Sequence, residues 1–256
     1  MCVLIQPFYA LVRDFDGGMD LPDEIEHHMP DYHLYDEWIE DEVRKAKQEK
    51  GDKFNERSFR VQFREYTDYS IGFLTRGCFR KCEFCVNKKY NHVFKHSPLE
   101  EFYDPSRKKI CLLDDNVLGC PQWRSILQEL IALKKPFKFK QGMDERLLTE
   151  EKCELLFNAN YDGDYTFAFD NISDYDLIHK KLEMIRRHTT SKSIKFYVLV
   201  GFEGTGAEDI ENAFNIKTVE AVSSQRTKSN SSSKRSSIES LYPTISLYFS
   251  RKKEYF

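Results

Sequence analysis

The chain has 256 residues, of which 40% are hydrophobic and 32% charged, so it is long enough for one large hydrophobic core with small appendages. Its net charge of -3 argues against bulk basic binding to nucleic acid or to a membrane surface. Seven cysteines, with no apolar run near the ~18 residues of a membrane helix, predict a cytoplasmic protein in a reducing compartment.

Residues 1–216 divide into two segments of different character. Residues 1–64 are acidic and irregular, apart from a charged helical stretch at residues 37–50. From residue 65 to about 216, strand patterns alternate with helices whose apolar residues recur at i, i+3 and i+4. The strands are expected at residues 69–75, 109–114, 137–141, 165–169 and 194–201, and the helices at residues 123–134, 149–158, 174–188 and 207–214. This alternation predicts an α/β domain with a parallel sheet, either a barrel or a doubly wound sheet.

Residues 217–256 form a third segment. Nine serines, together with lysines and arginines, lie between residues 223 and 240, and such a composition buries too little apolar surface to order itself. We therefore expect a flexible segment there. Residues 241–249 are apolar enough for a further strand, which Pro243 would restrict to a sheet edge or a strand start.

A run of three cysteines, Cys78, Cys82 and Cys85, directly follows the first expected strand with the spacing C-x3-C-x2-C. Three thiolates on one loop match three irons of a 4Fe-4S cluster and leave the fourth iron open. The alternative is a structural zinc site, whose fourth ligand would come from elsewhere in the chain. Zinc sites usually pair two short knuckles, and only one unpaired triple is present, so the spacing favours the cluster. The available fourth zinc ligands are Cys2, Cys111, Cys120, His92 and His96.

The cysteine run and several other blocks resemble the radical SAM superfamily. The blocks are residues 72–78, Phe84 before the third cysteine, and residues 112–116, 141–148, 167–171 and 197–202. The resemblance implies a partial (β/α) TIM-type barrel of five or six parallel strands over residues 65–216. It also implies a 4Fe-4S cluster on Cys78, Cys82 and Cys85 that binds S-adenosylmethionine (SAM) and cleaves it reductively. An electron donor such as flavodoxin or ferredoxin would be needed.

Polar residues follow the expected strands, and in a parallel barrel such strand ends meet at the functional face. The residues assigned to the SAM site are Phe84, Asp114, Asp115, Asn116, Gln141, Asp144, Arg146, Asp170 and Gly201. The acidic group at residues 114–116 would accept hydrogen bonds from the SAM ammonium, although Asp and Asn also favour a simple turn there. Asp144 and Arg146 would contact the SAM carboxylate, ribose or substrate, or would pair with each other. Gly201 would let adenine approach the backbone, or would serve as a turn glycine.

Two functional classes remain open. The first is a radical SAM enzyme with one cluster and an unidentified substrate. The second is a metal-stabilised binding or scaffold protein, including a radical SAM relative that keeps its cluster but does not turn over, because a serine-rich segment stands where similar proteins have a sixth strand. The remaining cysteines Cys111, Cys120 and Cys153 are scattered and are expected to be packed thiols.

Overall fold

The computed structural model describes residues 22–85, 87, 89–170, 172–188, 193–200 and 245–251. Within these residues no helix has the length and apolar character needed to cross a bilayer. Gly201, the expected helix at residues 207–214 and the serine-rich segment lie outside the described residues.

Two small parallel sheets form the centre of the fold. The first has the order β1 (Tyr69–Gly72), β4 (Lys109–Leu112) and β5 (Phe137–Phe139), and the second has the order β6 (Tyr165–Phe169), β7 (Ile194–Val200) and β8 (Ile245–Arg251). All pairings within both sheets are parallel. Isolated parallel bridges, Phe137 with Tyr161 and Met143 with Phe167, link the two sheets. The fold class is therefore mixed α/β with parallel sheets, and the described strands do not close into a barrel.

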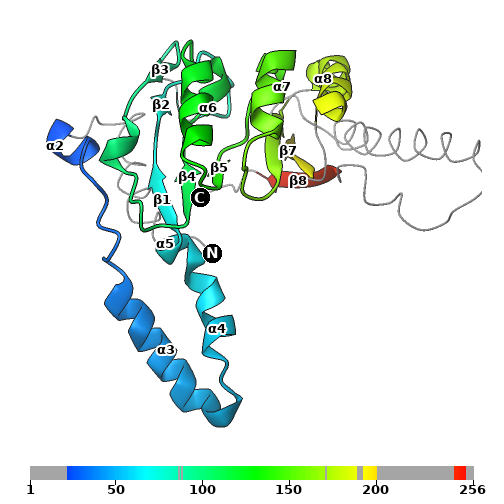
Figure 1. The fold of residues 1–256 in the computed structure, drawn as a ribbon. Coiled ribbons are helices and arrows are strands. Elements are labelled where there is room, and N and C mark those ends of the chain that lie inside the picture. Colours follow the sequence, from blue (N-terminus) through cyan, green and yellow to red (C-terminus); the bar gives the residue numbers. More distant parts are fainter. Residues whose placement is uncertain are drawn as a thin grey trace, which may run out of the picture.

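Three helices connect successive strands and stand side by side along the sheets: α6 (Trp123–Ala132), α7 (Glu150–Phe157) and α8 (Tyr175–His188) (Figure 1). Each begins and ends within a few residues of its expected position. Helix α7 begins after Thr149, whose hydroxyl accepts a hydrogen bond from the Lys152 amide at 3.3 Å, as expected of an N-cap.

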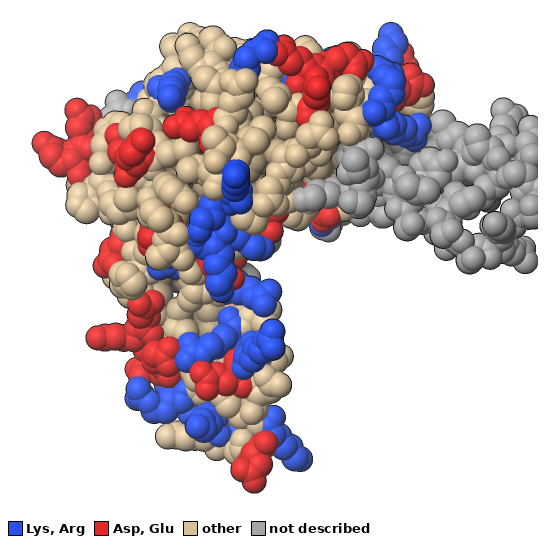
Figure 2. Space-filling model, viewed as in Figure 1, with Lys and Arg blue, Asp and Glu red and all other residues tan. Residues whose placement is uncertain are grey.

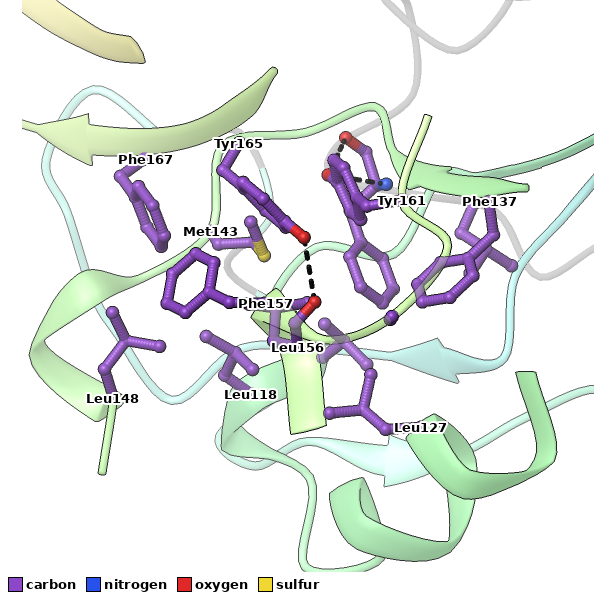
Figure 3. Close-up of a cluster of buried hydrophobic side chains, with 14 of the residues drawn as sticks. Leu118, Leu127, Phe137, Met143, Leu148, Leu156, Phe157, Tyr161, Tyr165 and Phe167 are labelled. Atoms are coloured by element: carbon purple, nitrogen blue, oxygen red, sulfur yellow. Dashed lines mark hydrogen bonds between the residues drawn. The ribbon is translucent and has the colours of Figure 1, made fainter. Parts of the chain in front are cut away.

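The main core lies between these helices and the sheets (Figure 3). Phe137 and Phe167 of the strands are fully buried, as are Leu127 of α6 and Leu156 of α7. Tyr165 is also fully buried and keeps its hydroxyl satisfied by donating to the Leu156 carbonyl oxygen at 2.8 Å. Because alternate residues of β6 point to this core, the odd-numbered side chains of Tyr165–Phe169 are buried while the even-numbered ones are not.

A helical hairpin projects from the α/β body before β1 (Figure 1). After the short α2 (Asp23–Glu26), it consists of α3 (Asp36–Lys50), the 3-10 turn η1 (Gly51–Lys53), α4 (Glu56–Phe59), η2 (Arg60–Phe63) and α5 (Arg64–Thr67). Its own small core contains Ile39, Val43 and Phe63. Figure 2 shows acidic and basic side chains interspersed along the hairpin, and one such pair joins Arg60 to Glu40 at 2.8 Å. The helical stretch expected at residues 37–50 is confirmed as α3, and the other helices add order that the sequence pattern did not indicate.

The expected strands are confirmed, β6 with its expected bounds and the others with shifted ends. The stretch at residues 69–75 is two strands, β1 and β2 (Thr75–Arg76), and β2 pairs antiparallel with β3 (Phe94–Lys95) outside the parallel sheets. The terminal strand is confirmed as β8, which lies at the edge of its sheet beside β7. Short 3-10 turns complete the described elements: η3 (Leu99–Glu101), η4 (Val117–Gly119), η5 (Glu145–Leu147) and η6 (Ile172–Asp174). The division of the chain at residues 64 and 216 stays a prediction.

Candidate functional site

The three clustered cysteines lie on a long loop between β2 and β3, which we call the cysteine loop (residues 77–93, described except for residues 86 and 88). Strand β2, from which the loop starts, follows the carboxyl end of β1, the edge at which β4 and β5 also end. Side chains that follow β4 and β5 meet the loop, as expected at the carboxyl edge of a parallel sheet.

Gly77 begins the loop in a conformation that other residues rarely adopt. Its φ is +87°, and an added Cβ would lie 2.4 Å from the His92 carbonyl oxygen. Glycine is needed here because it has no side chain to clash and tolerates positive φ. The chain therefore turns sharply into Cys78 and packs its two ends against each other.

The three cysteine side chains are partly exposed and carry no disulfide. The Cys78 sulfur accepts two hydrogen bonds, from the Arg80 amide at 3.3 Å and from the Asn116 side-chain amide at 3.4 Å. Burial raises the pKa of the Cys82 thiol, with Asp170 raising it further and Arg146 opposing the change. In the described part of the chain, no three His, Cys, Asp or Glu side chains form a ready metal-binding group. The thiols therefore share one loop without converging on one point.

The acidic residues after β4 hold the cysteine loop in place. Asp114 is 2% exposed, and its carboxylate accepts from the Thr75 amide and hydroxyl, both at 2.6 Å, and from the Leu74 amide at 3.3 Å. Burial raises the Asp114 pKa to about 6, against these hydrogen bonds. Asp115 accepts from the Asn87 side chain at 2.6 Å, and burial raises its pKa as well.

Asn116 is buried at 4% exposure beside Cys78. Its amide nitrogen donates to the Cys78 sulfur, whereas its side-chain oxygen has no hydrogen-bond partner among the described residues. A buried amide oxygen without a partner carries a cost of about 1–3 kcal/mol. The Asn116 side-chain oxygen next to Cys78 is thus suited to accept from a donor that the described residues do not supply.

The residues after β5 form a chain of ion pairs. Asp144 accepts from Arg80 of the cysteine loop at 2.8 Å and from Arg146 at 2.6 Å, and Arg146 reaches Asp174 of η6 at 2.9 Å. Burial lowers the Arg146 pKa, but its acidic partners outweigh that effect and raise it overall. The pairing of Asp144 with Arg146, one of the two alternatives for these residues, is therefore observed.

Two further carboxyl groups lie at this end of the sheets. Glu145 is 1% exposed, one of its oxygens has no partner among the described residues, and burial raises its pKa to about 8. Burial also raises the pKa of Asp170, which follows β6, to about 6. The bridge from Met143 to Phe167 places the segment after β5, which carries Glu145, beside β6, which Asp170 follows. Both groups therefore favour the neutral acid more than an exposed carboxyl would.

The remaining predicted site residues have varied positions. Gln141 is exposed, Phe84 is 39% exposed on the cysteine loop, and Gly201 lies outside the described residues. The structure adds three residues that sequence reasoning missed: Arg80, Asn87 and Glu145. A basic residue inside the cysteine spacing was a signal for Arg80, whereas nothing in the sequence distinguished Asn87 or Glu145 from surface polar residues.

The side chains that could complete a metal site with the three loop cysteines differ in burial and in their partners. Cys111, Cys120 and Cys153 are buried, and burial raises the thiol pKa of each, to about 11 for Cys111 and Cys153, so these three are packed thiols as expected. The His96 ring bonds Glu26 and Ser97 and stacks on His27. Among the described candidates for a fourth zinc ligand, Cys111 and Cys120 are buried and His96 is bonded to other residues, which leaves the exposed His92. The Cys78 sulfur accepts two hydrogen bonds and His92 is exposed, so the donor set suits a cluster on the three loop thiols and also a zinc ion held by these thiols and His92.

No protein-family model matches the chain, and no curated protein matches it at a significant level.

Proposed function

We propose that this protein is a radical SAM iron–sulfur enzyme with a substrate still to be identified. Cys78, Cys82 and Cys85 would hold a 4Fe-4S cluster, and SAM would occupy its open side. With SAM bound, such a cluster supplies one-electron reductive cleavage of the sulfonium, the electron coming from a flavodoxin- or ferredoxin-type donor. The observation that carries the proposal is the position of the three-cysteine loop at the carboxyl edge of parallel strands, with donors directed at the Cys78 sulfur.

The strand arrangement supports the barrel that this function requires. The six strands β1, β4, β5, β6, β7 and β8 follow one another in chain order within two parallel sheets that share bridges at Phe137 and Met143. We infer that they belong to one partial (β/α) barrel with helices α6, α7 and α8 outside. In such a barrel, the ends of β4, β5 and β6 surround the site that the cysteine loop covers.

The predicted SAM ligands divide according to their present partners. Asp114 and Asp144 are buried and already bonded within the protein, so we assign them to the support of the cysteine loop. Asp115 and Asp170 are less buried, and among the described residues the Asp170 carboxylate has no hydrogen bond or ion pair. We therefore assign contacts with the SAM ammonium or ribose to Asp115 and Asp170, with the Asn116 oxygen beside the cluster.

A metal-stabilised, catalytically inactive protein is the second candidate. It is favoured by the number of strand-end side chains that bond within the protein. In this case the loop would keep a metal for structure, and SAM would find few open partners.

The test is anaerobic reconstitution followed by measurement of iron, zinc and 5'-deoxyadenosine. We expect about four irons per chain, loss of the cluster in Cys78→Ala, Cys82→Ala and Cys85→Ala, and SAM-derived 5'-deoxyadenosine under a strong reductant. Cys153→Ala is the matched control, because this thiol is buried in α7 away from the loop. Stoichiometric zinc would reject the cluster. A full cluster without SAM cleavage would select the inactive relative.

A further inference from the structure

A continuous chain of charged side chains runs from the cysteine loop, through the loop after β5, to the turn η6 that precedes α8. Arg80 pairs with one oxygen of Asp144, Arg146 pairs with the other, and Arg146 continues to Asp174. Asp144 is the only member that contacts both arginines through separate oxygens. The loop after β5 is thus joined directly to the loop that carries the three thiols.

Because Asp144 is buried, its carboxylate depends on both of its arginine partners. The Asp144 side chain is 7% exposed, that of Arg146 18% and that of Arg80 33%. A carboxylate with so little access to water requires its cationic partners, because an unpaired buried charge is strongly unfavourable. Both Asp144 oxygens being occupied, release of Arg80 would leave one of them without a partner. Arg80 is therefore held at one place instead of extending into solvent.

Arg80 also contacts the cysteines through its backbone. It lies between Cys78 and Cys82, and its amide donates to the Cys78 sulfur at 3.3 Å. Its guanidinium lies 5.1 Å from the ring centre of Phe79, and Phe79 packs against Gly119, where a side chain would leave no room. Anchoring the Arg80 side chain consequently fixes the backbone that presents the first cysteine.

We propose that Asp144 is a positioning residue that orders the cysteine loop through Arg80, so that the arrangement of the three thiols depends on the end of β5. This ordering is a property of the metal-free chain. Its consequence for cluster retention rests on the proposed function, whereas the ordering itself does not. Asp144 is thereby removed from the set of residues that contact SAM.

The test compares Arg80→Gln, Asp144→Asn and the double variant in the full-length, iron-free chain by hydrogen–deuterium exchange. We expect amide exchange in residues 78–92 to rise about tenfold in each variant, with no further rise in the double variant, because both changes remove one interaction. Exchange in α7 should stay unchanged. Arg60→Gln is the matched control, since it breaks an ion pair with Glu40 on the distant hairpin. Arg80→Lys, which keeps the charge, should restore most of the protection.

Unchanged exchange in the loop of Arg80→Gln would overturn the proposal, as would an equal rise in the loop and in α7. Since Arg80 is one-third exposed, its variant tests the proposal even if Asp144→Asn fails to fold. A second readout uses reconstituted protein challenged with a chelator, where we expect Arg80→Gln to lose iron faster than Arg60→Gln. If the wild type binds no iron but the exchange result holds, only the proposed function fails.

Discussion

Glu145 gives the sharpest quantitative test of the site, because it is a buried carboxyl group, one oxygen of which has no partner in the described part of the chain. Burial raises its pKa from 4.5 to about 8 in the folded protein. Below pH 4.5 the group is protonated in both the folded and the unfolded chain and has no pH-dependent effect. Between pH 4.5 and about 8, the unfolded chain releases the proton first, so the free energy of unfolding falls as pH rises.

The magnitude follows from the size of this pKa change. A difference of one pKa unit corresponds to about 1.4 kcal/mol, so the loss reaches about 5 kcal/mol as an upper limit near pH 8. Glu145→Gln removes the titration while keeping the shape of the side chain. We therefore expect Glu145→Gln to be no more stable than wild type near pH 5. Between pH 5 and pH 8.5, its free energy of unfolding should rise relative to that of wild type by about 2–5 kcal/mol.

The assay is urea unfolding of the iron-free chain at pH 5, 7 and 8.5. Glu49→Gln on the exposed face of α3 is the control for the same change of side chain at the surface. The comparison uses the change with pH, because a glutamine amide in the same place has its own pH-independent cost. Parallel stability profiles for wild type and Glu145→Gln would refute the reasoning.

Three further substitutions test the supports of the site. Gly77→Ala should destabilise the cysteine loop by at least about 1–2 kcal/mol, seen as faster amide exchange in residues 78–92, because the φ of +87° disfavours any side chain. Asp114→Ala should lower thermal stability by more than Asp115→Ala, whereas Asp115→Ala should weaken SAM binding more in a titration of reconstituted protein; the reverse order would contradict our assignment. Tyr32→Phe should cost about 1–3 kcal/mol in chemical unfolding, because the Tyr32 hydroxyl accepts from the Ile71 amide at 2.8 Å and donates to the Phe102 carbonyl at 2.6 Å.

Periodicity located most elements of the α/β segment. The bounds of β6 were predicted to the residue, and α6 and α7 to within two residues at each end, because their apolar positions repeat with a clear period. The expected strand at residues 69–75 was too long. Asp114, some forty residues later in the sequence, accepts the amide protons of Leu74 and Thr75 and draws the chain out of the sheet. Interactions of this separation leave no local pattern.

In the candidate site, too, the sequence indicated some features, whereas others depend on contacts between distant residues. Part of the predicted strand-end group bonds to the cysteine loop or its base, since parallel strands bring their ends together. These residues are Asp114, Asp115, Asn116 and Asp144. The sequence did not determine which atoms pair. Asp144 and Arg146 could be expected to pair because they are two residues apart, but the bond from Asp144 to Arg80 spans 64 residues and depends on how the loop folds back. Glu145 is the buried residue of η5, and no local pattern in the sequence indicated its burial.

The contacts of the cysteine loop explain why so many strand-end side chains are already engaged. A loop that must present three thiols loses much conformational freedom when a cluster binds, and each freely rotating residue that becomes fixed costs about 1–2 kcal/mol. Bonds to the loop or its base from Asp114, Asp115, Asn116 and Asp144 fix part of this backbone during folding instead. Less ordering then remains for the moment of metal capture, and affinity for the metal rises accordingly. The polar strand ends therefore serve the cluster in our proposal chiefly by holding its loop, with Asp115, Asn116 and Asp170 assigned to contact SAM.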